Sequence, residues 1–178
     1  MSRNVRIRLL AAVVDAHLGD PRRSEAISRL TRLTLERMGL SKPTVVRGAE
    51  AAMICDIGLI DSSSKKSEAA RRSIYQLHPE RSATILAEMG GFEDLLAIIR
   101  CHHARPTIDA PIESFVICAC EAYCDAVAIR GGFLARDVLR CGMGVEFKAE
   151  VVEHVLAVLR STSGEEREDR IATAGPIS

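Results

Sequence analysis

The chain has 178 residues, of which 24 are basic and 24 acidic, so its formal net charge is zero. A chain without net positive charge lacks the field that holds nucleic acid or an anionic membrane, and we predict neither as a partner. The length is typical of one domain. Hydrophobic residues make up 47% of the chain and aromatic residues only 3%, so the core must be aliphatic, which favours packed helices over a β-sandwich.

The apolar runs are shorter than the ~18–20 residues that a membrane span needs, and no signal peptide is recognisable. We therefore predict a cytoplasmic location. In that compartment the default state of the six cysteines is a buried, reduced thiol that packs like a small hydrophobic side chain. Cys120 and Cys124 lie one helical turn apart, which leaves a redox or metal role open for that pair.

Capping and turn residues divide the chain into helices, and no strand pattern appears, so the predicted fold class is an all-α bundle of about seven to eight helices. Asp20 is the expected N-cap of the second helix, with Pro21 at its first position. Ser41 is the expected start of the third helix, and His78-Pro79 of a later one. The expected helices cover residues 5–18, 21–38, 41–60, a short segment up to 77, 78–90, 92–103, 111–129, 134–141 and 147–159.

The same pattern gives a domain organisation. Residues 1–19 are expected to form an N-terminal helix that packs on the domain and that offers a route to a homodimer. Residues 20–160 form the domain itself. Residues 62–66 read as a polar loop, 104–111 as a proline-containing loop, and 161–178 as a flexible C-terminal tail.

Four residues stand out as candidates for chemistry. His102 and His103 are adjacent at the end of an expected helix, and His78 lies at the expected start of another. Asp56 lies in an otherwise apolar helix, where an acid is costly to bury unless it is paired or metal-bound. Three imidazoles and a carboxylate suit Zn, Fe or Mn with open coordination positions. Spacing alone does not show that the four residues converge, and an isolated surface or core histidine is the common alternative.

Five segments occur in an order and at spacings that resemble one protein family. Residues 51–60, AAMICDIGLI, resemble the family's AALLHDIGKI. Residues 78–86 resemble its HPE-x-x-A-x-I-L segment, and residues 98–103, IIRCHH, its IVRYHHE. Residues 116–127 resemble LAVADVYDAL, and residues 144–153, GVEFKAEVVE, its G-x-x-F-D-P-x-V-V-E. The family is the HD-GYP domain, an all-helical, metal-dependent phosphohydrolase fold, and the resemblance covers roughly residues 20 to 160.

The chain also departs from that family at several of its functional positions. Arg23 takes the place of the early histidine, Cys55 that of the HD histidine, and Leu59 that of the following lysine. The family's late aspartate falls on Ala122, with Glu121 one residue away. The loop after the histidine pair is shortened and lacks the family's Gly-Tyr. These departures remove most ligands of the first of the family's two metals.

The resemblance implies that the second metal's ligand set is complete, with Asp56, His78, His102 and His103. We therefore expect one divalent transition metal ion, which ligand type alone leaves open among Fe, Mn, Zn, Ni and Co. Cys55 and Glu121 are candidates for extra ligands. No catalytic residue is assigned.

The expected function is a catalytically impaired, HD-GYP-like regulatory or signalling domain that keeps one metal. Its expected partners are a nucleotide or phosphoester ligand, or a signalling protein. One alternative is a divergent metal-dependent phosphohydrolase or phosphodiesterase that acts on a cyclic dinucleotide or another phosphoester. A second alternative is a metal-free helical interaction scaffold.

Overall fold

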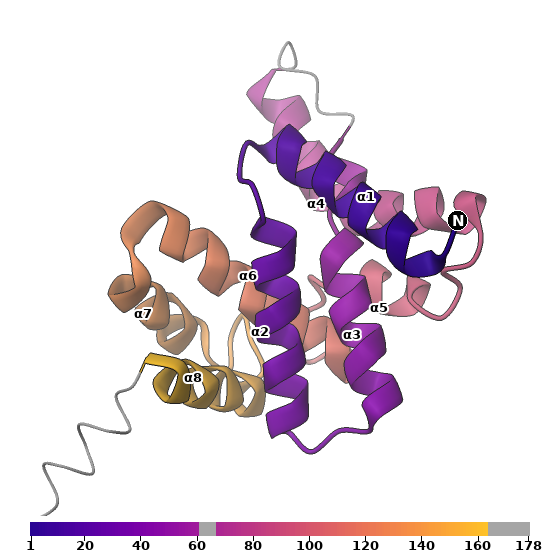
Figure 1. The fold of residues 1–178 in the computed structure, drawn as a ribbon. Coiled ribbons are helices and arrows are strands. Elements are labelled where there is room, and N and C mark those ends of the chain that lie inside the picture. Colours follow the sequence, from indigo (N-terminus) through magenta and orange to yellow (C-terminus); the bar gives the residue numbers. More distant parts are fainter. Residues whose placement is uncertain (61–66, 164–178) are drawn as a thin grey trace, which may run out of the picture.

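The structure, a computed structural model, describes residues 1–60 and 67–163. This part is all-helical, with eight α-helices, one short 3₁₀ helix and no strand (Figure 1). The elements are α1 (Arg3–Leu18), α2 (Arg23–Arg37), α3 (Lys42–Ile54), η1 (Ile57–Leu59), α4 (Glu68–Met89), α5 (Leu96–Arg100), α6 (Ile112–Arg130), α7 (Gly132–Gly142) and α8 (Ala149–Ser163). The predicted fold class is confirmed.

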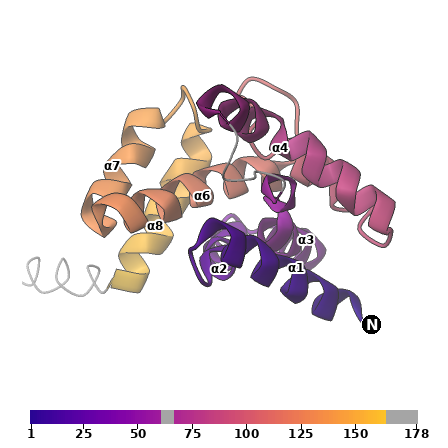
Figure 2. The ribbon, with the colours of Figure 1, turned by 90° about the horizontal axis from the view of Figure 1, so that it is seen from above.

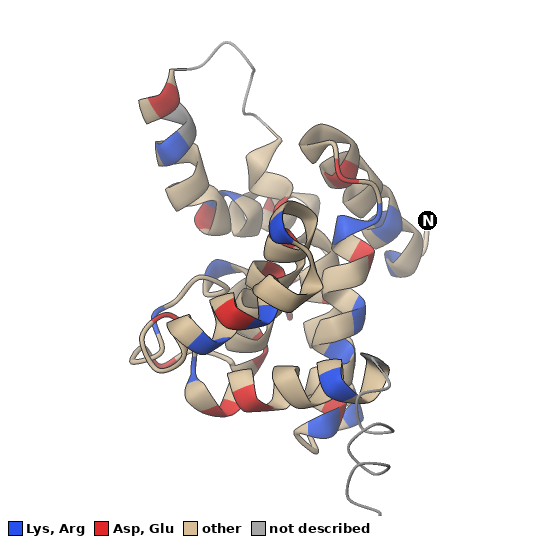
Figure 3. Ribbon diagram, turned by 90° about the vertical axis from the view of Figure 1, so that its left-hand side faces the viewer, with Lys and Arg blue, Asp and Glu red and all other residues tan. Residues whose placement is uncertain are grey.

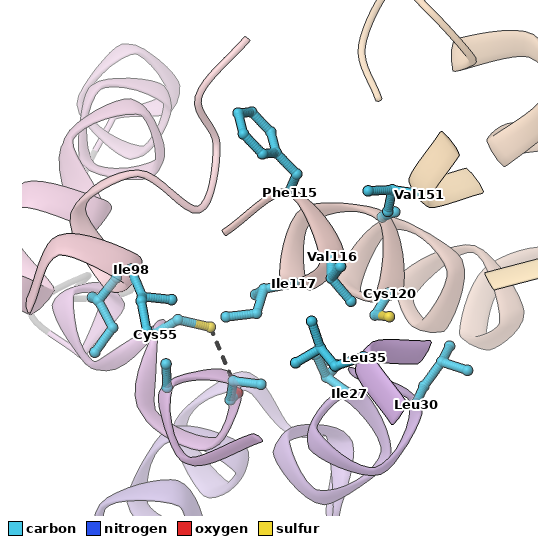
Figure 4. Close-up of a cluster of buried hydrophobic side chains, with 14 of the residues drawn as sticks. Ile27, Leu30, Leu35, Cys55, Ile98, Phe115, Val116, Ile117, Cys120 and Val151 are labelled. Carbon is cyan, nitrogen blue, oxygen red and sulfur yellow. Dashed lines mark hydrogen bonds between the residues drawn. The ribbon is translucent and has the colours of Figure 1, made fainter. Parts of the chain in front are cut away.

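The apolar helix α6 is the centre of the bundle. It packs against α2, α3, α5, α7 and α8, and in the view from above it crosses the middle of the molecule (Figure 2). The core around it is mainly aliphatic, as predicted. Ile27 and Leu35 of α2, Ile117 and Cys120 of α6, and Val151 of α8 meet there and are fully buried (Figure 4).

The prediction that Asp20 caps the second helix is wrong. Helix α2 begins at Arg23, after Arg22 in a left-handed conformation with φ 69°. The backbone N–H and the hydroxyl of buried Ser24 donate instead to the buried carboxylate of Asp15, at 3.0 and 2.6 Å. The cap therefore comes from the preceding helix. At Ser41 the prediction is confirmed, since its hydroxyl accepts from the N–H of Thr44.

Three predicted helix boundaries also differ from the structure. His78-Pro79 does not start a helix, because α4 runs continuously from Glu68 to Met89 with Pro79 inside it. The helix expected over 41–60 ends at Ile54 and is followed by η1. The helix expected over 92–103 is the short α5. Ser161–Ser163 belong to α8, while the rest of the predicted tail and the predicted loop at 62–66 lie outside the described residues.

Helix η1 lies unusually close to α4, and Gly58 makes this possible. Its N–H donates to the hydroxyl of Ser82 at 2.9 Å. A Cβ at Gly58 would lie 2.5 Å from the carbonyl oxygen of His78 and 2.8 Å from the amide nitrogen of Ser82. Because η1 follows directly on Asp56, this approach places the Asp56 carboxylate beside the His78 ring.

Ion pairs and hydrogen bonds from its first two turns hold the N-terminal helix α1 against the bundle. Arg3 pairs with Glu50 of α3 at 2.8 Å and with Asp94 at 2.9 Å. Arg6 donates to the carbonyls of Met89 and Gly90. These contacts join α1 to the end of α4 and the turn that follows it.

Basic and acidic residues are interspersed along the helices, as the colours of the ribbon in Figure 3 show. In the described part of the chain, no helix combines the length and the apolar character needed to cross a membrane. All six cysteines are free thiols. Cys55 and Cys120 are buried as predicted, whereas Cys141 is exposed and the other three are partly buried.

Candidate metal centre

The structure brings all four predicted metal ligands together, with Glu121 beside them. Asp56 comes from the start of η1, His78 from α4, His102 and His103 from the turn after α5, and Glu121 from α6. His78 Nε2 lies 3.0 Å from Asp56 Oδ1 and 3.0 Å from His102 Nε2. His102 Nε2 lies 3.8 Å from Asp56 Oδ1, and His103 Nε2 lies 3.6 Å from Glu121 Oε2. Side chains from four separate parts of the chain thus converge on one point.

Backbone carbonyls set the orientation of the two buried imidazoles. His78 Nδ1 lies 2.5 Å from the carbonyl oxygen of Tyr75, and His102 Nδ1 lies 2.6 Å from that of Ile99. A carbonyl only accepts, so each Nδ1 carries the proton and donates. In the neutral rings each Nε2 then presents a lone pair toward Asp56. This is the arrangement by which a second hydrogen bond prepares a histidine for a metal.

The proline after His78 explains why the Tyr75 carbonyl is available. In an α-helix this carbonyl would accept from the N–H of residue 79, four positions later. Pro79 has no N–H, so it leaves the carbonyl without that partner. The His78 Nδ1–H occupies the vacated position. The His-Pro dipeptide therefore fixes the His78 tautomer instead of starting a helix.

Replacing Pro79 by alanine is therefore expected to weaken metal binding about 10- to 100-fold, the usual effect of losing a partner behind a metal ligand. The new N–H would compete for the Tyr75 carbonyl and loosen the His78 ring. Stability should not fall, because an interior proline disfavours a helix. Metal affinity measured by competition with a chromophoric chelator checks this, with Pro43→Ala in the first turn of α3 as the control. Equal affinities in both variants would contradict the assignment.

The buried carboxylates of Asp56 and Glu121 each turn one oxygen toward Arg23 and the other toward the histidines. Asp56 Oδ2 accepts from Arg23 Nη1 at 2.6 Å, and Glu121 Oε1 from Arg23 Nη2 at 2.9 Å. Their other oxygens, Asp56 Oδ1 and Glu121 Oε2, face the histidines and have no hydrogen-bond donor. The side chains are only 3% and 4% exposed. Buried acceptors without a donor are costly, and a cation between them and the Nε2 atoms would satisfy them.

A third carboxylate leaves the centre with more negative than positive charge. Asp125, one turn after Glu121 on α6, pairs with Arg23 through Nε at 2.7 Å and Nη2 at 3.0 Å. One guanidinium thus faces three carboxylates, and the imidazoles add no charge when neutral. A divalent cation among the histidines would balance this excess.

The titration behaviour of the centre reflects the same imbalance. Burial and the nearby charge of Asp56 raise the pKa of Glu121 to about 8. Burial alone would raise the pKa of Asp56, but contacts with His102 and His78 and the charge of Arg23 hold it well below its usual range. Burial lowers the pKa of His103 to about 3, so its ring is neutral at neutral pH. A metal ion would meet a neutral imidazole there and would displace a proton from Glu121.

Cys55 lies at the edge of the centre and also belongs to the core. Its sulfur is in the same group of potential ligand atoms as Asp56, His102 and Glu121, all within 4.8 Å of one another. It donates to the carbonyl of Ala52 at 3.6 Å and lies near Ile98 and Ile117 (Figure 4). Burial raises the pKa of the thiol, so without a metal it stays protonated. Its role as an extra ligand stays a prediction.

The centre opens on one side into a pocket of about 620 Å³. His103, whose side chain is 29% exposed, and Glu121 form its inner wall. The pocket is also lined by Tyr75, Arg105 and Glu146. A ligand in this pocket would therefore touch the His103–Glu121 side, while Asp56, His78 and His102 stay buried behind it.

Two residues of this centre were not recognised in the sequence as participants. Arg23 was identified only as the replacement of a histidine, and Asp125 was not singled out. The available signal was the four-residue spacing of Glu121 and Asp125, which places both on one face of α6. The described chain holds two groups of potential metal ligands, one of His78, His102 and His103 and one of Cys55, Asp56, His102 and Glu121. The Cys120–Cys124 pair belongs to neither group.

Comparison of the chain with protein-family models, curated proteins and solved structures finds no match. The fold and the site together define an all-helical protein with a candidate metal centre of histidines and carboxylates.

Proposed function

We propose that this chain binds one divalent transition metal ion at Asp56, His78 and His102, with His103 and Glu121 on the pocket side. One observation carries the proposal. Oδ1 of buried Asp56 has no hydrogen-bond donor and faces the Nε2 atoms of His78 and His102. Each of these rings carries its proton on Nδ1, which donates to a backbone carbonyl. Imidazole and carboxylate ligands suit Fe, Mn, Zn, Ni and Co, so the ligand types do not select among these metals.

We further propose that the chain is a catalytically impaired, HD-GYP-like domain with a regulatory role. Hydrolysis by two metals uses a nucleophile held between two ions. Here the Arg23 guanidinium lies against Asp56 on the side away from the histidines, and Leu59 replaces the lysine expected from the resemblance. The bound metal would supply Lewis acidity at the pocket wall and would join η1, α4, the turn after α5, and α6. A nucleotide, phosphoester or signalling protein that meets this wall would sense the metal.

The metal content of purified protein, measured by elemental mass spectrometry, tests the first proposal. Wild type should carry about one metal ion per chain, and His102→Ala should lose it because one of three buried ligands is gone. His154→Ala is the matched control, because this partly buried histidine of α8 lies outside the cluster. A metal-free wild type that also fails to take up added Zn²⁺, Mn²⁺ or Fe²⁺ would leave the interaction scaffold as the better description.

A second candidate function is a divergent metal-dependent phosphohydrolase, and the pocket beside His103 favours it. The pocket has room for a phosphoester, and Arg105 in its lining supplies a cation that can pair with phosphate. Metal-loaded wild type, tested on cyclic dinucleotides and simple phosphoesters, would then show turnover that His102→Ala lacks. Absence of turnover across such a panel supports the impaired, regulatory assignment.

A further inference from the structure

Arg23 is a buried cation held almost entirely by acids. Its side chain is 9% exposed and its nitrogens contact three carboxylates, those of Asp56, Glu121 and Asp125, at 2.6 to 3.0 Å. The three acids come from two elements, the start of η1 and helix α6, whereas Arg23 begins α2. The guanidinium therefore joins the two sides of the centre.

Three acids around one charge are more than an arginine needs. A single carboxylate accepts two parallel N–H bonds from a guanidinium, and Asp125 already does so. Asp56 and Glu121 add two further carboxyl groups, and each is more than nine-tenths buried with one oxygen lacking a donor. Three carboxylates thus converge on the Arg23 position, two of them buried and the third, that of Asp125, 41% exposed, and carboxylate oxygens are the ligands that a hard divalent cation takes.

We propose that the Arg23 guanidinium is a built-in cation in the position of a metal ion, and that Asp56, Glu121 and Asp125 are a latent site for a hard divalent cation such as Mg²⁺ or Mn²⁺. The charge is covalently attached, so it cannot be removed by chelation or exchanged. It holds the outer oxygens of Asp56 and Glu121 and thereby directs their inner oxygens to the histidines. The inference concerns the acid side of the centre and holds whether or not the histidines bind a metal.

Neutral replacements of Arg23 test this. In chelator, Arg23→Ala and Arg23→Gln should each lower the melting temperature by about 10 °C, because they leave buried acids without a cation. Added Mg²⁺ or Mn²⁺ should restore at least half of that loss, and equilibrium dialysis should find one more bound ion per chain than in wild type. Arg23→Lys keeps a charge in place and should bind no additional ion.

Arg47→Ala is the matched control for an ion pair between a partly exposed arginine and a single buried carboxylate. Arg47 pairs with one carboxylate, that of Glu113, at 3.0 Å, and the Glu113 side chain is 5% exposed. Its removal also leaves a buried acid without its ion-pair partner, but a single acid cannot hold a metal. This variant should lose stability without any recovery in Mg²⁺ or Mn²⁺.

The inference is overturned if neither neutral variant binds more metal than wild type. It is equally overturned if both stay unfolded when they are refolded in Mn²⁺, because the ion should then replace the missing charge. The counts also separate this inference from the proposed function. If wild type and Arg23→Ala each bind one ion, the histidine site is supported and the latent site is rejected. If wild type binds no ion and Arg23→Ala binds one, the latent site is supported and the histidine site is rejected.

Discussion

Replacing Gly58 by alanine is expected to destabilise the chain by about 3 kcal/mol, at the upper end for overpacking. The added Cβ would overlap the carbonyl oxygen of His78 and the amide of Ser82. These are backbone atoms of α4, so neither can rotate away as a flexible side chain does. Relief requires η1 to move from α4, which breaks the Gly58–Ser82 hydrogen bond and carries Asp56 away from His78.

Urea unfolding checks this result, with Gly132→Ala as the control. A Cβ on Gly132, at the start of α7, would meet only the Tyr123 hydroxyl at 3.7 Å, an ordinary contact. That variant should match wild type or exceed it slightly, because alanine favours a helix more than glycine does. Equal unfolding midpoints for the two variants would show that η1 and α4 are not in close contact.

Replacing Asp56 by asparagine is expected to weaken metal binding about 100-fold or more, because it neutralises the one carboxylate that faces both His78 and His102. Metal-free stability should change by less than about 1 kcal/mol, because asparagine keeps a side-chain oxygen that accepts from Arg23 and the negative excess falls. The variant should thus separate the metal site from the stability of the fold.

Chelator competition gives the affinity, and melting with and without metal gives the accompanying stabilisation. Wild type should melt higher when metal is added, by mass action on the folded state, and Asp56→Asn should show little of this increase. Asp125→Asn is the matched control, since Asp125 contacts Arg23 and lies outside both potential ligand groups. Retained affinity in Asp56→Asn would remove this residue from the ligand set.

The fold class was predictable because its signals are local. An aliphatic composition, helix-length apolar patterns and a capping residue such as Ser41 act within a few residues of one another. The errors arose where a distant group determines the local structure. Asp15 supplies the α2 cap from another helix, and the effect of Pro79 depends on the His78 ring that takes up the freed carbonyl.

The residues that meet in the candidate site were predictable from the sequence, and the charges around them were not. Asp56 and the three histidines were found through residue type and through a family resemblance. Whether Arg23 would be a lost ligand or a replacement charge depends on how α2 packs against α6, which spacing along the chain does not specify. Asp125 became part of the site only because the Arg23 side chain reaches it.

X-ray absorption at the metal edge of protein loaded with one equivalent of Zn²⁺ tests the central claim most directly. A centre built on His78, His102 and Asp56 predicts a first shell of nitrogen and oxygen, with outer scattering from at least two imidazole rings that decreases in His78→Ala. A sulfur atom in the shell would add Cys55 to the ligands. A spectrum without imidazole scattering, or one identical in wild type and His78→Ala, would contradict the assignment of this centre.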